Sequence, residues 1–114
     1  MESLQEFEIE VIEKLTANIL NPEQIGEILK NYEAVGIEFT GAGYFLSIKH
    51  SEIPKEKFTC SDPILIGHTE GDIICGFVIF IENHQLTLEC HEWGAADIPS
   101  DFRDRAVKIS VSQN

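Results

Sequence analysis

The residues with the most reactive side chains, Cys90, His91 and Glu92, follow one another directly in the sequence. Nucleophilic catalysis by a thiolate needs an imidazole within hydrogen-bond distance of the sulfur. This segment has the alternating pattern of a strand, and adjacent side chains of a strand point to opposite faces, so Cys90 and His91 are not expected to form a dyad. A dyad of distant residues, such as Cys60 with His68, stays open as an alternative. We predict that the protein has no catalytic residue and is not an enzyme.

Metal binding needs three or four histidine, cysteine or carboxylate side chains that converge on one point. The four histidines show no HxH or HExxH spacing. The three cysteines form no CxxC motif, and we expect them as buried, reduced thiols. Glu89 and His91 would share one face of a strand, where an ion pair between them is favoured over a two-ligand metal site. We predict no bound metal and no cofactor.

Two further segments have compositions that could bind anions. The stretch Thr40-Gly41-Ala42-Gly43-Tyr44 is rich in glycine, but it lacks a phosphate-loop lysine and leads into a strand pattern, which favours a structural turn. The segment Asp101-Phe102-Arg103-Asp104-Arg105 holds both arginines of the chain beside two aspartates, and we expect local ion pairing there.

The elements that must position these residues begin with two helices. Within Leu4–Leu20, apolar residues recur at three- and four-residue steps with glutamates between them, which predicts an amphipathic helix. A strand-like alternation over residues 7–11 is the competing pattern. Asn21 followed by Pro22 predicts the start of a second helix, because asparagine caps helices and proline fits their first position. Gly36 is the expected stop signal for this helix.

From residue 37 onward the apolar period changes to two, which indicates strands. The segments that show strand character are 44–50, 63–69, 73–82, 86–93 and 107–111. Asn83-His84-Gln85 separates the third from the fourth and predicts an antiparallel hairpin. With Asn83 and His84 as a two-residue loop, the expected core-facing pairs are Ile81 with Leu86, Ile79 with Leu88, and Phe77 with Cys90.

The other face of this hairpin would mix apolar with ionisable side chains, namely Val78, Phe80, Glu82, Thr87, Glu89, His91 and Trp93. Such a face is expected either to lie under a helix or to bind a partner. The strand aromatics Tyr44, Phe45, Phe77, Phe80 and Trp93 could stack nucleobases, but the basic groove that must accompany them is missing. Packing in the core is therefore the preferred role for the aromatic residues.

Helices first and hairpin-connected strands afterwards predict an α+β fold, with a mostly antiparallel sheet and the two N-terminal helices packed on one side of it. The chain of 114 residues has the usual length of one domain. We predict a single domain over residues 1–114, helical over residues 1–35 and mainly β over residues 36–114.

Charge restricts the classes of partner. Twenty acidic and eight basic residues give a formal net charge of −12 at pH 7, which disfavours nucleic acid and anionic membranes and attracts basic proteins. Solubility is the competing reason for such acidity. The longest apolar run, residues 73–81, is too short to span a bilayer, and the N-terminus is acidic, unlike a secretory signal. We predict a cytoplasmic protein without membrane association.

Two stretches of the chain resemble a known family. They are Thr40–Leu46, and Gly76–Glu82 continuing through Leu86–Gly94 to Ile98-Pro99 and Asp101–Arg103. Over residues 36–105 they are similar to the small α+β immunity proteins of bacterial polymorphic toxin systems, in particular the immunity protein 10 group. The resemblance implies a non-enzymatic protein that is encoded beside a secreted toxin and blocks that toxin inside the producing cell. Many such toxins are basic nucleases, so charge complementarity would speed the encounter.

These observations favour a non-enzymatic acidic binding protein, an immunity-type inhibitor that neutralises a toxin partner. Interfaces combine aromatic anchors with charges, and the residues that do so here are Glu89, His91, Glu92, Trp93 and Arg103. One alternative is a small assembly protein that forms a homodimer through the second face of the hairpin. A further alternative is a small-molecule-binding domain with a pocket between helices and sheet near His91 and Cys90.

Overall fold

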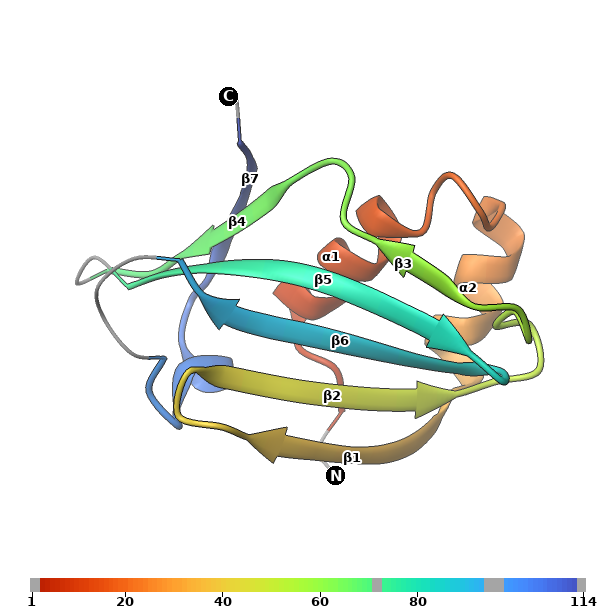
Figure 1. The fold of residues 1–114 in the computed structure, drawn as a ribbon, viewed down its shortest axis with the longest axis horizontal. Helices are drawn as coiled ribbons and strands as arrows, with labels where there is room; N and C mark the ends of the chain where they lie inside the picture. Colours follow the sequence, from red (N-terminus) through yellow and green to blue (C-terminus); the bar gives the residue numbers. More distant parts are fainter. Residues whose placement is uncertain (1–2, 71–72, 94–97, 113–114) are drawn as a thin grey trace.

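The computed structural model describes residues 3–70, 73–93 and 98–112, and within them it has two α-helices and seven strands (Figure 1). The helices are α1 (Glu6–Leu15) and α2 (Pro22–Asn31), and a short 3-10 helix, η1, spans Phe102–Asp104. The strands are β1 (Glu33–Phe39), β2 (Gly43–Lys49), β3 (Phe58–Cys60), β4 (Leu65–His68), β5 (Ile74–Glu82), β6 (Gln85–Glu92) and β7 (Lys108–Val111). In these ranges, no helix is long and apolar enough to cross a membrane.

The described strands belong to one antiparallel sheet with the order β1-β2-β6-β5-β4-β7, and β3 pairs with β5 as well. β5 is nine residues long, so a single edge of it pairs with β3 at residues 79–81 and with β4 at residues 74–76. Both helices lie behind the sheet in Figure 1. The predicted α+β fold, with its antiparallel sheet and helices on one side, is confirmed.

The first helix is shorter than predicted. α1 ends at Leu15 instead of Leu20. Thr16 is the C-cap of the helix, and its hydroxyl donates to the Ile12 carbonyl at 2.6 Å. The Leu20 backbone N–H then donates to the Thr16 carbonyl at 2.9 Å in a turn, and Asn21 is extended where it caps the next helix. The amphipathic pattern itself is confirmed, and the buried residues of α1 are Phe7, Glu8, Val11, Ile12 and Leu15.

The second helix begins where Asn21 predicts it to begin. The Asn21 side chain accepts a hydrogen bond from the Gln24 backbone N–H at 2.8 Å, and the Gln24 side chain accepts one from the Asn21 backbone N–H at 3.0 Å. The helix ends at Asn31, however, and Gly36 lies inside β1, so the predicted stop at Gly36 is wrong. Antiparallel pairing with the mostly buried β2 takes the chain from Glu33 onward into the sheet, with an irregular register before Gly36.

Two strands, β1 and β3, lie largely outside the segments that the sequence predicts. β1 is mostly exposed and β3 has only three residues, so neither contains a clear apolar alternation. Both form because a neighbouring strand offers unpaired backbone groups, which a sequence pattern does not record.

The hairpin of β5 and β6 has the predicted loop and register. Asn83 and His84 have positive φ angles of 53° and 63°, as a two-residue turn of type I′ requires. The core-facing pairs are those predicted, Ile81 with Leu86, Ile79 with Leu88, and Phe77 with Cys90. The hairpin forms the middle of the sheet, with β2 beside β6 and β4 beside β5.

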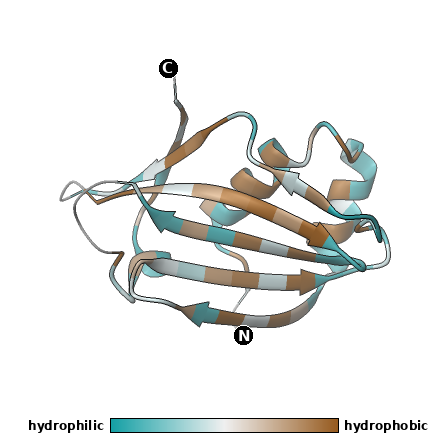
Figure 2. Ribbon diagram, in the orientation of Figure 1, coloured by the Kyte–Doolittle hydropathy of each residue, from teal (hydrophilic) through white to brown (hydrophobic). Residues whose placement is uncertain are grey.

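The core lies between the helices and one face of the sheet. The ring of Phe7 on α1 lies 6.1 Å from that of Phe77 on β5 and 5.8 Å from that of Phe102 in η1, measured between centroids. Alternate residues of the central strands face this core, and they are Tyr44, Leu46, Ile48, Phe77, Ile79, Ile81, Leu86, Leu88 and Cys90. Figure 2 shows that hydropathy alternates along β6 but is high along most of β5. β5 therefore carries apolar side chains on both faces of the sheet.

Candidate functional site

The face of the sheet that points away from α1 and α2 is called the open face here. Its central residues are Phe45, Ser47, Thr87, Glu89, His91, Val78, Phe80, Glu82 and the adjoining Trp93. Phe80 is 41% exposed and Trp93 is 44% exposed, and Phe45 and Val78 are partly buried. Of the two alternatives that the sequence left open for this face, a covering helix is absent from the described residues (Figure 1). The expected packing of the strand aromatics in the core is confirmed for Tyr44 and Phe77, but it is wrong for Phe45, Phe80 and Trp93.

Three of the five predicted interface residues come together on the open face. Glu89 and His91 alternate along β6, and Trp93 directly follows the strand. Glu92 is exposed, but its partner across β5 is the buried Cys75, so its strand position belongs to the helix side of the sheet. Glu92 therefore does not share a surface with the other three.

The rings of His91 and Trp93 stack on each other beside Gly76. Their centroids are 6.1 Å apart, with an angle of 29° between the planes. A Cβ atom on Gly76 would lie 2.6 Å from atoms of both rings, so the missing side chain lets the rings lie close to the sheet backbone. The Trp93 backbone N–H donates to the Ile74 carbonyl at 3.1 Å and fixes this end of the chain. The two rings thus pack against each other beside the sheet backbone and leave their outer surfaces to solvent.

Glu89 lies at the centre of the open face. Its neighbours across the strands are Phe45 on β2 and Val78 on β5, both of them apolar. The expected ion pair with His91 is not formed, and His91 Nδ1 lies 3.1 Å from the Glu92 carbonyl oxygen. Within the described part of the chain, no hydrogen bond or ion pair reaches the Glu89 carboxylate. A partly buried carboxylate thus faces solvent among apolar side chains without a cation.

A shallow hollow of about 280 Å³ adjoins Phe80 at the other end of the open face. Thr59, Phe80 and Thr87 line it together with Lys57 and Glu82. Its volume is near the lower limit of ligand pockets, which enclose most of a bound molecule. Neither Cys90 nor His91 lines this hollow, so it does not correspond to the pocket of the small-molecule alternative.

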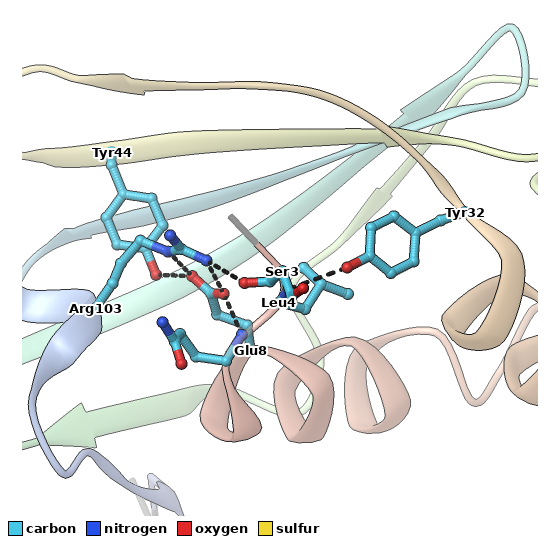
Figure 3. A network of polar contacts seen from close by, with 7 residues as sticks. Ser3, Leu4, Glu8, Tyr32, Tyr44 and Arg103 are labelled. Carbon is cyan, nitrogen blue, oxygen red and sulfur yellow. Dashed lines mark hydrogen bonds and ion pairs between the residues drawn. The ribbon is translucent and has the colours of Figure 1, made fainter. Parts of the chain in front are cut away.

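A buried ion pair joins α1 to η1 (Figure 3). Arg103 donates from Nε and Nη2 to the two carboxylate oxygens of Glu8, at 2.7 and 2.8 Å, and from Nη2 to the Ser3 carbonyl at 3.0 Å. Tyr44 donates its hydroxyl proton to Glu8 Oε2 at 2.6 Å. Glu8 is fully buried and Arg103 is 5% exposed. The assignment of Arg103 to a partner interface is therefore corrected, because its guanidinium neutralises an internal carboxylate.

The Glu8 carboxylate is saturated with donors. Besides Arg103 and Tyr44, the Gln5 backbone N–H donates to Glu8 Oε1 at 2.8 Å. Burial, with a further contribution from the charge of Glu8, raises the pKa of Tyr44 far above its usual range. The phenol therefore stays protonated and keeps donating to Glu8 while the protein is folded. This network is enclosed, and its role is to fasten the N-terminal helix to the C-terminal segment.

Sequence reasoning did not identify Glu8 as a core residue, although a signal existed. Glu8 is four residues from both Leu4 and Ile12, which places it on the buried stripe of the helix. A buried acid needs a cation, and the chain has only eight basic residues that could supply one.

The predicted local ion pairing in the Asp101–Arg105 segment is confirmed for Arg105, whose Nη2 lies 3.0 Å from Asp101 Oδ1.

The cysteines are free and buried, as predicted. Cys90 faces the helices whereas His91 faces the open side, so the expected lack of a Cys90–His91 dyad is confirmed. A hydrogen bond with Cys75, together with burial, raises the pKa of the Cys90 thiol, which disfavours a thiolate. Cys60 faces the core and His68 is exposed on the other side of the sheet, so these two residues do not form a dyad either.

In the described ranges, no group of three or more histidine, cysteine or acidic side chains lies where it could hold a metal ion. His50 Nε2 lies 3.1 Å from Glu27 Oε2, which also accepts a hydrogen bond from Asn31 at 2.6 Å. The hydrogen bond from Asn31 lowers the pKa of Glu27 most, and the bond with His50 lowers it further.

The stretch at Gly41 and Gly43 is the predicted structural turn, where the chain passes from β1 to β2 with both glycines at positive φ.

Comparisons with protein-family models, curated proteins and solved structures find no match for this chain. The resemblance to immunity proteins therefore stays a prediction from the sequence. The chemistry of the open face and the net charge remain the observations from which a function can be inferred.

Proposed function

We propose that this chain is a non-enzymatic binding protein that neutralises a basic protein partner, and that the partner binds on the open face. The observation that carries the proposal is the gathering of large apolar side chains on a sheet face that no described helix covers. Phe80 and Trp93 are each more than two-fifths exposed there. Apolar patches of this kind mark interaction surfaces, and aromatic anchors supply much of the binding energy.

Charge favours a basic partner over a second copy of the chain. Each copy carries a formal charge of −12, so two copies repel each other, whereas a basic protein is attracted from a distance. The helices on the far side of the sheet contribute to this field with more acids than bases. Their exposed acids are Glu6, Glu13, Glu23 and Glu27, against Lys14 and Lys30.

The resemblance to immunity proteins supports a toxin domain as the class of partner. Under this proposal the protein acts in the cytoplasm of the producing bacterium and blocks the toxin there. The placement of Cys90 and His91 on opposite faces supports a role without nucleophilic catalysis. An inhibitor needs only a complementary surface, which the open face provides.

The test is capture of the partner by the tagged, full-length protein from native lysate, with identification by mass spectrometry and subunit counting by light scattering. We expect a stoichiometric basic protein. By calorimetry, Trp93→Ala should weaken its binding about 30-fold, because an aromatic anchor contributes roughly 2 kcal/mol or more. Val111→Ala is the control, since Val111 is 47% exposed on β7 opposite the buried Leu65, on the helix side of the sheet, and it should leave the affinity unchanged.

Two outcomes would contradict the proposal. A captured partner that binds Trp93→Ala as tightly as the natural protein would place the interface away from the open face. A homodimer that captures no basic protein and that Trp93→Ala converts to a monomer would instead support the assembly alternative, with the open face buried between two copies.

A further inference from the structure

Two carboxylates of this protein, Glu8 and Glu89, have opposite surroundings. Glu8 is fully buried and receives hydrogen bonds from Arg103, Tyr44 and a backbone N–H. Glu89 is partly buried, yet in the described part of the chain it receives no donor and no cation. A carboxylate that has lost part of its hydration gains from a charged donor. Glu89 is therefore the polar group on the open face that is best prepared for an external cation.

The lysine that shares the face on the neighbouring strand does not supply that cation. Lys49 on β2 is opposite Gln85 on β6, four residues from Glu89 along the strand. At the rise of an extended strand, this separation is roughly 13 Å. The cross-strand neighbours of Glu89 are the apolar Phe45 and Val78. The carboxylate is thus flanked by surface that suits the aliphatic part of a long cationic side chain.

The aromatic surface of His91 and Trp93 is adjacent to this carboxylate. His91 follows Glu89 by two residues on the same face, which places it roughly 7 Å further along β6. A guanidinium is planar, donates two parallel hydrogen bonds to one carboxylate, and stacks on aromatic rings. An ammonium is a compact charge that gains less from such surroundings.

We infer that Glu89 binds the guanidinium of an arginine side chain on the basic partner, with the rings of His91 and Trp93 as the stacking surface. This inference rests on the proposed function and specifies the chemistry by which the open face recognises its partner. Phe45 and Val78 contact the aliphatic part of that side chain.

The inference can be tested before any partner is known. The full-length, isotope-labelled protein is titrated by NMR with the peptide acetyl-Gly-Arg-Gly-amide and with two matched peptides that carry citrulline or lysine in place of arginine. The arginine peptide should shift the signals of Glu89, His91 and the Trp93 indole. The citrulline peptide, which has nearly the same shape without the charge, should not shift them, and the lysine peptide should bind more weakly.

Two variants separate local recognition from general attraction. Glu89→Gln should weaken binding of the arginine peptide about tenfold, because it removes the acceptor charge. Glu13→Gln removes the same charge from an exposed position on α1, on the other side of the sheet, and should leave binding unchanged. Equal losses in the two variants, or no loss in Glu89→Gln, would overturn the inference.

The captured partner then distinguishes this inference from the proposed function. If Trp93→Ala abolishes partner binding while Glu89→Gln preserves it, the open face is the interface but Glu89 binds no arginine of the partner. The inference then fails and the proposed function stands. If the arginine peptide binds at Glu89 and no basic protein binds the chain, the site stands and the proposed function fails.

Discussion

Removal of the Arg103 guanidinium would test the buried network directly. Arg103→Met keeps an unbranched side chain but deletes two hydrogen bonds to Glu8, at 2.7 and 2.8 Å, and one to the Ser3 carbonyl at 3.0 Å. Glu8 stays fully buried and loses its cation. Breaking a buried ion pair in this way costs roughly 3–5 kcal/mol, because one charge is left uncompensated. A loss of that size is a large part of the 5–15 kcal/mol that is typical for a domain.

Urea unfolding, followed by Trp93 fluorescence and circular dichroism, measures the loss. With an m value of about 1.5 kcal/mol per molar urea, the midpoint should fall by about 2–3 M. Arg105→Met is the matched control, because it also removes one arginine from an ion pair. The Arg105 side chain is 35% exposed and that of its partner Asp101 is 61% exposed, so this variant should lose less than about 1 kcal/mol.

A second change identifies the cause of the loss. Glu8→Gln in the Arg103→Met background removes the uncompensated charge and keeps an acceptor for the Tyr44 hydroxyl. The double variant should be more stable than Arg103→Met alone by about 1 kcal/mol or more. If Arg103→Met loses no more stability than Arg105→Met, or if Glu8→Gln lowers the stability further, the reasoning from desolvation is refuted.

Three further predictions concern single side chains. Stability should fall above about pH 10, because the unfolded phenol of Tyr44 ionises there while the raised pKa keeps the folded phenol protonated; urea unfolding at increasing pH should show a smaller fall for Tyr44→Phe, and an equal fall would contradict this. Gly43→Ala should cost more than about 3 kcal/mol, since the new Cβ would clash with the Cys90 carbonyl at a positive φ, and a thermal melt close to that of the natural protein would disprove it. Asn31→Ala should raise the pKa of Glu27 towards its ordinary value in a carboxyl NMR titration, and an unchanged pKa would show that Asn31 is not its main cause.

The sequence predicted best where one local signal decides the structure. The loop at Asn83-His84 and the alternation on both sides of it determine the register of β5 and β6, and every predicted pair is present. The start of α2 at Asn21 follows equally from capping chemistry. These features depend on neighbouring residues, so the fold class could be predicted without knowledge of distant contacts.

The features that escaped prediction depend on distant partners. Gly36 is read locally as a helix stop, but pairing with β2 places it in a strand. Arg103 is buried because it pairs with Glu8, and only the folded protein brings these two residues next to each other. The open face is a mixed case, because its residues were predicted as a set while the position of the helices decided that it is uncovered. An ion pair was predicted between Glu89 and His91. In the structure, His91 instead contacts the Glu92 carbonyl and stacks on the ring of Trp93.

Glu8 and Arg103 are 95 positions apart in the sequence, and this distance affects the order in which the elements can fold during synthesis. At a translation rate of 5–20 residues per second, the ribosome adds Arg103 roughly 5–20 s after Glu8. Until then, docking of α1 on a nascent sheet would bury a carboxylate without its cation, whereas the hairpin of β5 and β6 needs only residues already made. The helix that is synthesised first is therefore expected to be sealed into the core only after Arg103 has been made.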